Sequence, residues 1–265
     1  LRKDAERVMG EQQFVTVSIV ASQLNRELEL RLDALRKVAP RAVRSFQQGS
    51  AAMQDFLDEH QSLQMLFNGS LFITDADGIR VACTPFSSGR IGNDLSDRDY
   101  LQNALVGGKA LVGKLIIARP YQTPVIAMAA PIIDSQGKSI GALSGVIELD
   151  GPSFLDQIPE SHFSKTGGYL LVSRAHRLII TATEKARVLS PLEDRFSISL
   201  LERSRDDYES TKIVVNSLGE EVLLSAKNIP AADWVLFASL PTAEMFAPLY
   251  AMQRFILLAT IILTM

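Results

Sequence analysis

The sequence predicts an α+β fold in which one long helix is followed by two small antiparallel sheets of similar design. Three observations predict it. Apolar residues recur every three or four positions as far as about residue 48, which is helical spacing. From about residue 70, short β-favouring runs with period-two alternation are separated by turn residues. Two strands, a helical excursion and three further strands occur twice, so each half is predicted to form one sheet.

The first segment, from about Arg2 to Gln48, is predicted to be helical. Charged residues such as Arg26 and Lys37 fall between its apolar positions, so the helix has one polar and one apolar face. Pro40 removes one backbone hydrogen bond, so we expect a kink or a split there. A second helix is expected over residues 51–66. The apolar positions of the first helix are Val17, Val20, Ala21, Leu24, Leu28, Leu32, Leu35, Ala39, Val43 and Phe46.

The first sheet is predicted between residues 70 and 149. It starts with a hairpin around Asp75-Ala-Asp-Gly78, where the glycine supplies a positive φ. The Asp-x-Asp-Gly spacing also occurs in calcium loops, but the further acidic ligands of such a loop are missing, so a turn is favoured. The expected strands cover residues 70–74, 79–84, 112–118, 125–133 and 139–149, with a polar helix over residues 96–106.

The second sheet repeats this pattern more briefly. Thr242 then caps a last helix, which runs into the apolar segment 255–265. A membrane span needs about 20 apolar residues, so this segment is predicted to be the start of a transmembrane helix. A buried C-terminal helix is the alternative. The expected strands of the second sheet cover residues 168–173, 178–181, 212–216, 221–229 and 234–240, with a helix over residues 197–204.

Composition and motifs exclude several classes of function. Hydrophobic residues make up 47% of the 265 and charged residues 22%, which excludes an intrinsically disordered chain. The 30 acidic and 27 basic residues give no strong positive field for nucleic acid. Cys83 is the only cysteine, which excludes an intrachain disulfide and a cysteine-based zinc cluster. No catalytic or metal-ligating spacing is present, so we expect no cofactor, no metal and no enzyme; a hydrolase that uses Ser144 is a third alternative.

Several strings in this order are similar to one family of sensor domains. They are Asp94-Leu-Ser-Asp-Arg-Asp-Tyr100, the paired strands from Pro124 to Gly145, and the closing strand and helix from Asp233 to Glu244. With the long first helix, they make nearly the whole chain resemble a double Cache (PDC-type) sensor, whose two sheets are PAS-like. The resemblance implies a stalk helix and second helix over 1–66, a membrane-distal module with the ligand pocket over 67–160, a membrane-proximal module over 161–241, and an exit helix with a truncated transmembrane segment over 242–265.

The resemblance also implies where this chain works. It places the domain in the periplasm, in a bacterial receptor of the inner membrane. The helix that returns to the membrane would carry the signal to a cytoplasmic diguanylate cyclase, phosphodiesterase, histidine kinase or chemoreceptor output. A homodimer through the N-terminal helix and contact with the membrane through the flanking helices are expected.

Two arginine and tyrosine pairs map to pocket-lining places in that family. Arg98 and Tyr100 stand at the helix entry, and Arg119 and Tyr121 flank a proline where the next strand ends. An arginine fork offers two charge-assisted hydrogen bonds to a carboxylate, and a tyrosine adds a directional donor. Arg98 paired with Asp97 or Asp94 is the structural alternative, and solvation is the alternative for Arg119. The hydroxyls of Thr123 and Ser144 are lesser candidates for the pocket.

One departure from the family pattern narrows the range of expected ligands. Amino-acid-binding members carry an aspartate for the ligand's ammonium group near the end of the last strand. Gly145 and Val146 stand there instead, and the acidic residues Glu148 and Asp150 lie two or more positions late. We therefore expect a simple carboxylate or another small polar anion. The leading hypothesis is a non-catalytic sensor of a small organic ligand. The alternative is a structural module that sets receptor dimerisation and binds no small molecule.

Overall fold

The structure, a computed structural model, describes residues 2–118, 123–149, 152–156, 158, 166–192, 201, 211–216 and 219–264. A long N-terminal helix is followed by two antiparallel sheets, which confirms the predicted α+β fold. The chain divides into two compact units, which we name by the sheet that each contains. The first-sheet unit comprises residues 23–156 and 230–232, and the second-sheet unit comprises residues 1–22, 157–229 and 233–265.

The predicted N-terminal helix forms and is split at Pro40. The proline lies in the first turn of a short 3-10 segment, because its ring lacks the N–H that a continuing α-helix needs. The expected second helix is also divided, at His60. The segments are α1 (Arg2–Val38), the 3-10 turn (Ala39–Ala42), α2 (Val43–Gln48), α3 (Ser50–Glu59) and α4 (Gln61–Gln64).

The first sheet is antiparallel and has the strand order β2-β1-β6-β5-β3, with β4 paired to β5. One helix, α5 (Asp99–Leu105), lies between β2 and β3 in the chain, where the sequence predicts a polar helix. Two short strands take the place of the single strand expected over 112–118. The strands are β1 (Leu71–Asp75), β2 (Arg80–Thr84), β3 (Leu111–Val112), β4 (Ile116–Ala118), β5 (Thr123–Ile133) and β6 (Ser139–Glu148).

The turn between β1 and β2 is held by its own carboxylate. Asp75 accepts hydrogen bonds from the backbone N–H groups of Asp77 and Ile79 at 3.0 and 2.9 Å, and Gly78 adopts a φ of +83°. The Asp-x-Asp-Gly sequence therefore serves a turn that needs a left-handed residue. Within the described ranges, no group of three or more His, Cys, Asp or Glu side chains could hold a metal ion.

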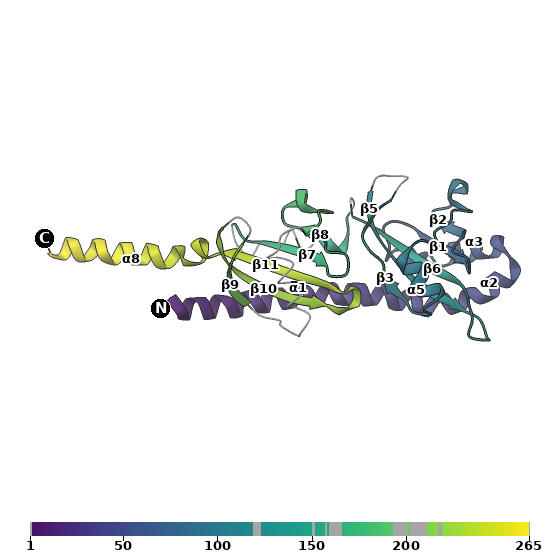
Figure 1. Ribbon diagram of the computed structural model, residues 1–265, viewed down its shortest axis with the longest axis horizontal. Helices are drawn as coiled ribbons and strands as arrows, with labels where there is room; N and C mark the ends of the chain where they lie inside the picture. Colours follow the sequence, from purple (N-terminus) through teal and green to yellow (C-terminus); the bar gives the residue numbers. More distant parts are fainter. Residues whose placement is uncertain are drawn as a thin grey trace. The chain divides into compact units, whose positions relative to one another are not determined.

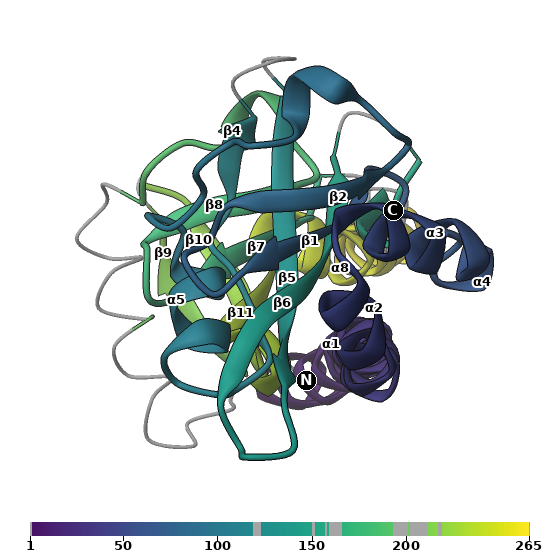
Figure 2. The ribbon, with the colours of Figure 1, turned by 90° about the vertical axis from the view of Figure 1, so that its right-hand side faces the viewer.

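Helices lie on both faces of the first sheet (Figure 2). Leu101 of α5 packs with Ala127 of β5 in one buried cluster. Phe46 of α2 lies against Gly141 of β6, where an added Cβ would come within 2.4 Å of the phenylalanine ring. Because neighbouring residues of a strand point to opposite faces, these contacts place α5 and α2 on opposite sides of the sheet.

The second sheet repeats the strand order of the first, as β8-β7-β11-β10-β9. In both sheets the first strand of the opening hairpin pairs with the last strand of the sheet, β1 with β6 and β7 with β11. This confirms the predicted repeat. The helix expected over 197–204 lies outside the described residues, apart from Leu201. The strands are β7 (Gly168–Ser173), β8 (Leu178–Ala182), β9 (Thr211–Val215), β10 (Glu221–Ile229) and β11 (Trp234–Pro241).

Both terminal helices pack on the second sheet (Figure 1). The buried Gln13 of α1 donates its Nε2 group to the backbone oxygens of Leu223 and Ala238 at 3.2 and 2.8 Å. Helix α8 covers Thr242–Thr264, and its residue Phe246 packs in a buried cluster with Leu223. Among the helices that the structure describes, none is both long enough and apolar enough to span a bilayer.

Candidate functional site

The start of α5 carries two of the predicted ligand-binding residues. Asp99 accepts hydrogen bonds from the backbone N–H groups of Tyr100 and Lys114 at 2.9 and 3.1 Å, which fixes the helix entry to the following loop. Tyr100 is buried in the same cluster as Ala127 of β5. Arg98 precedes the helix in an extended conformation and is half-buried. The entry to α5 therefore holds an arginine and a tyrosine beside the first sheet.

A cavity of about 350 Å³ lies at this place in the first-sheet unit. Arg98 and Tyr100 both line it, together with residues of strands β1, β2, β4, β5 and β6 and of the segment that follows β2. Its wall is therefore part aliphatic and aromatic and part charged. The lining residues are Ser70, Phe72, Arg80, Arg90, Asn93, Asp94, Leu95, Arg98, Tyr100, Ile116, Ala118, Val125, Ala127, Val146 and Glu148.

The two predicted side chains on this wall differ in their electrostatic surroundings. Nε of Arg98 lies 3.3 Å from Oδ1 of Asp97, whose side chain is 70% exposed, so this ion pair adds little to stability. Burial raises the pKa of Tyr100 to about 12, and the neighbouring charges of Arg98 and Arg80 oppose that rise. The Tyr100 phenol therefore keeps its proton at neutral pH and can donate a hydrogen bond.

The sequence matches one known family over most of its length. Residues 2–249 match the family described as Cache domain. The chain belongs to the Cache domain family. This confirms the resemblance drawn from the helix entry and the paired strands. No curated protein matches the chain significantly.

Solved structures with the same fold include ligand-binding domains of chemoreceptors. The ligand-binding domain of the Pseudomonas aeruginosa PAO1 amino acid chemoreceptor PctC, in complex with GABA, is 18% identical with a TM-score of 0.68, over 88% of this chain and 100% of that one. The domain of Pseudomonas fluorescens CtaA with L-serine is 19% identical with a TM-score of 0.64, over 91% and 99%. The Mlp24 domain with asparagine is 15% identical with a TM-score of 0.70, over 93% and 97%. These likenesses establish the fold.

Only some of the predicted ligand-binding residues line the cavity of this Cache domain. Arg98 and Tyr100 come together on its wall. Thr123, half-buried at the start of β5, and Ser144, fully buried in β6, are not among the residues that line it. Arg119 and Tyr121 lie outside the described residues.

Two acidic residues line the cavity, Glu148 and Asp94. From the sequence, we found no carboxylate at the family's aspartate position and placed Glu148 too far along the last strand. Counting positions along β6 does not show which of its side chains face the cavity. Residues 146 and 148 share one face of β6, because side chains alternate along a strand. This alternation also turns Glu148 toward the cavity. It is the sequence pattern from which the position of Glu148 could have been predicted.

Two further arginines of the cavity were also missed by the sequence analysis. Arg80 is the first residue of β2, and Arg90 ends the 3-10 turn Ser88–Arg90. Both line the cavity. The only hint in the sequence is that Arg80 precedes an uncharged run, Val-Ala-Cys-Thr, within a short strand. A charged residue in such a strand is either exposed to solvent at the edge of the sheet or has a functional role, such as binding a ligand.

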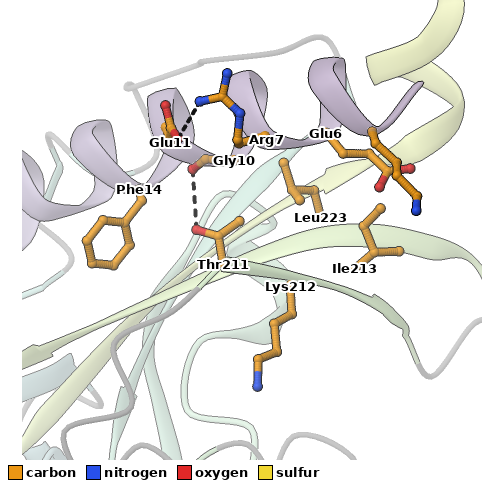
Figure 3. Close-up of a pocket in the computed structure, with 10 residues that line it drawn as sticks. Glu6, Arg7, Gly10, Glu11, Phe14, Thr211, Lys212, Ile213 and Leu223 are labelled. Atoms are coloured by element: carbon orange, nitrogen blue, oxygen red, sulfur yellow. Dashed lines mark hydrogen bonds and ion pairs between the residues drawn. The ribbon is translucent and has the colours of Figure 1, made fainter. Parts of the chain in front are cut away.

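A second hollow, of about 510 Å³, lies in the second-sheet unit between α1, β9 and β10 (Figure 3). Thr211 of β9 donates its hydroxyl to the backbone oxygen of Gly10 at 3.4 Å, so the helix and the strand are already in contact there. Arg7 is paired with Glu11 at 2.9 Å, and Lys212 points away from α1 in Figure 3. Neither Arg98 nor Tyr100 lines this groove, so we place the candidate ligand site in the first-sheet unit.

Proposed function

We propose that the first-sheet cavity binds a small organic molecule that carries a carboxylate group. The observation that carries the proposal is the charge of the wall, where three guanidinium groups stand with two carboxylates and leave one net positive charge. A ligand carboxylate neutralises this charge and accepts charge-assisted hydrogen bonds from the arginines. The neutral phenol of Tyr100 adds a donor.

The size of the cavity supports a ligand of a few heavy atoms. Its volume of about 350 Å³ is near the lower end of the range for small-molecule pockets, about 300 to 1,000 Å³. GABA, L-serine and asparagine, the ligands of the three similar domains, all carry a carboxylate. Glu148 and Asp94 provide acceptors for an amino or hydroxyl group on the same ligand, so an amino acid also fits this charge pattern.

The proposed role of binding is to signal across a membrane. In this proposal the domain is extracytoplasmic, the flanking helices anchor it to the inner membrane, and a cytoplasmic output domain responds. The chain itself performs no catalysis. A ligand shifts a conformational equilibrium only by its differential affinity for the two states, so the ligand must bind one arrangement of the flanking helices more tightly than the other.

A thermal-shift screen tests the binding proposal. The probes are pairs that differ only at the carboxylate, GABA with butylamine and succinate with succinamide, with L-serine and acetate added. A ligand that binds only the folded state at 100 times its Kd stabilises it by about 2.7 kcal/mol, so a carboxylate that binds raises the melting temperature and its matched partner does not. Unchanged melting with every carboxylate contradicts the proposal.

A dimerisation module is the second candidate, because α1 carries an exposed apolar stripe. Val8, Val15 and Ile19 are 50%, 57% and 60% exposed. Their separations of seven and four residues are those of a coiled-coil seam. The stripe favours a homodimer through the N-terminal helix. Such a dimer is compatible with ligand binding, and it could also be the role of the domain if no ligand binds.

A further inference from the structure

The first strand pair of the first sheet contains a β-bulge that redirects one arginine. Ile73 pairs with Ala82 and Thr74 pairs with Arg80, so Val81 is the extra residue. Without the bulge, alternation from Cys83 would place Arg80 on the opposite face of β2. With it, Arg80 shares the face of Phe72 and Cys83 and reaches the cavity.

The guanidinium of Arg80 is held by an aromatic ring. Its Cζ atom lies 4.3 Å from the centre of the Phe72 ring, which is a cation–π contact. Nε is buried, and in the described part of the chain it has no hydrogen-bond partner and the side chain has no ion pair. Burial lowers the pKa of Arg80, and the like charge of Arg90 acts in the same direction. A charge in this position is unfavourable until an anion meets it.

Asp94, an acidic residue of the cavity wall, is engaged by Ser96. Hydrogen bonds from the side chain of Ser96 and from its backbone N–H, the latter at 2.9 Å, lower the pKa of the Asp94 carboxyl. Arg98 differs from Arg80, because it already has Asp97 as an ion-pair partner. Of these two arginines, Arg80 is therefore the one whose charge the described chain leaves without a counterion.

We propose that Arg80, stacked on Phe72, is the main anchor for the ligand's carboxylate, and that Arg98 and Tyr100 assist it. The inference rests on the proposed function of the cavity and names the residue that decides its specificity for anions. A ligand that binds there supplies an acceptor for the buried Nε of Arg80, which has none among the described residues. An arginine held over a ring presents its fork to a planar carboxylate with little further loss of side-chain freedom.

Three variants of the full chain test this assignment, with acetate, succinate, GABA and L-serine as probes. Arg80→Met removes the charge and keeps a long side chain, Arg80→Lys keeps the charge without the planar fork, and Arg98→Met is the matched control on the same wall. Melting without ligand and calorimetric titration are measured for each. We expect Arg80→Met to melt at or above the wild-type temperature without ligand, because it removes a half-buried cation that has no ion-pair partner in the part of the chain that the structure describes.

Binding measurements should distinguish the role of Arg80 from that of Arg98. For the probe that binds the wild type best, we expect the affinity to fall about ten- to a hundredfold in Arg80→Met, with each 1.4 kcal/mol giving a factor of ten. The loss should be smaller in Arg98→Met, and Arg80→Lys should recover only part of it. If Arg80→Met binds within threefold of the wild type, or melts well below it without ligand, the assignment of Arg80 is wrong while the proposed function stands. If the wild type binds none of the probes, the proposed function fails and the assignment fails with it.

Discussion

Two fully buried serines in the sheets differ in their hydrogen bonding. The hydroxyl of Ser225 lies 2.6 Å from that of Thr211, whereas the hydroxyl of Ser144 has no partner in the described part of the chain. A buried hydroxyl without a partner costs about 1 to 3 kcal/mol. We therefore predict that Ser144→Ala leaves the free energy of unfolding unchanged or raises it by up to about 1 kcal/mol, while Ser225→Ala lowers it by about 1 kcal/mol.

Urea unfolding of the two variants beside the wild type checks this pair. Both changes remove one buried oxygen from a strand, so Ser225→Ala serves as the matched control. A loss in Ser144→Ala as large as that in Ser225→Ala would mean that the Ser144 hydroxyl makes a stabilising bond. A carboxylate-binding defect in a stable Ser144→Ala variant would return Ser144 to the list of ligand contacts.

The packing of α5 against the first sheet depends on a residue without a side chain. An added Cβ at Gly113, which follows β3, would lie 2.6 Å from Cδ1 of Tyr100 and 3.0 Å from the backbone oxygen of Ala127. The tyrosine ring must move to make room, and overpacking of this kind costs about 1 to 3 kcal/mol. We predict that Gly113→Ala lowers the free energy of unfolding by this amount and weakens carboxylate binding.

Gly89→Ala is the control for this prediction. A Cβ at Gly89 meets no atom within 4 Å, and the residue lies in the 3-10 turn that ends at the cavity-lining Arg90. Chemical unfolding and calorimetric titration should find Gly89→Ala close to the wild type in both respects. If Gly113→Ala binds the same probe with wild-type affinity, the position of the Tyr100 ring does not matter for the site.

At the scale of elements, local signals were sufficient for most of the boundaries. Pro40 divides the first helix, and the turn at Asp75–Gly78 separates β1 from β2, as the sequence predicts. Helix α5 is shorter than the predicted 96–106, because Ser96 and its neighbours are tied to the β1–β2 turn, with the N–H of Leu95 donating to the oxygen of Gly78 at 3.1 Å. That tie is a long-range contact, which periodicity does not report.

At the scale of the whole molecule, the exposed stripe on α1 predicts self-association. We predict that Ile19→Glu shifts the chain toward the monomer, because a charge in a helix seam is desolvated without a partner. Sedimentation velocity over a range of concentrations measures the shift. Ile133→Glu is the matched control, because Ile133 is also exposed, at 40%, but lies at the end of β5.

Two results would contradict the dimer. A wild-type chain that stays monomeric at every concentration would remove the stripe as a self-association surface. Equal weakening by Ile19→Glu and Ile133→Glu would mean that the loss comes from added charge rather than from the seam. In either case the carboxylate sensor remains as the function to test.

The sequence by itself determined the repeated sheet, the split first helix, the family, and the place of Arg98 and Tyr100 at the entry to α5. These features depend on residues close together in the chain, whose periodicity, turn residues and motif order are visible without a structure. The tertiary structure alone decided that Arg80, Arg90 and Glu148 share a wall with them. Arg80 is there because of a bulge in β2, and Glu148 because β6 lies between β1 and β5. Pairing register and strand order arise from contacts between residues far apart in the sequence, and a shift of one residue turns a side chain to the other face.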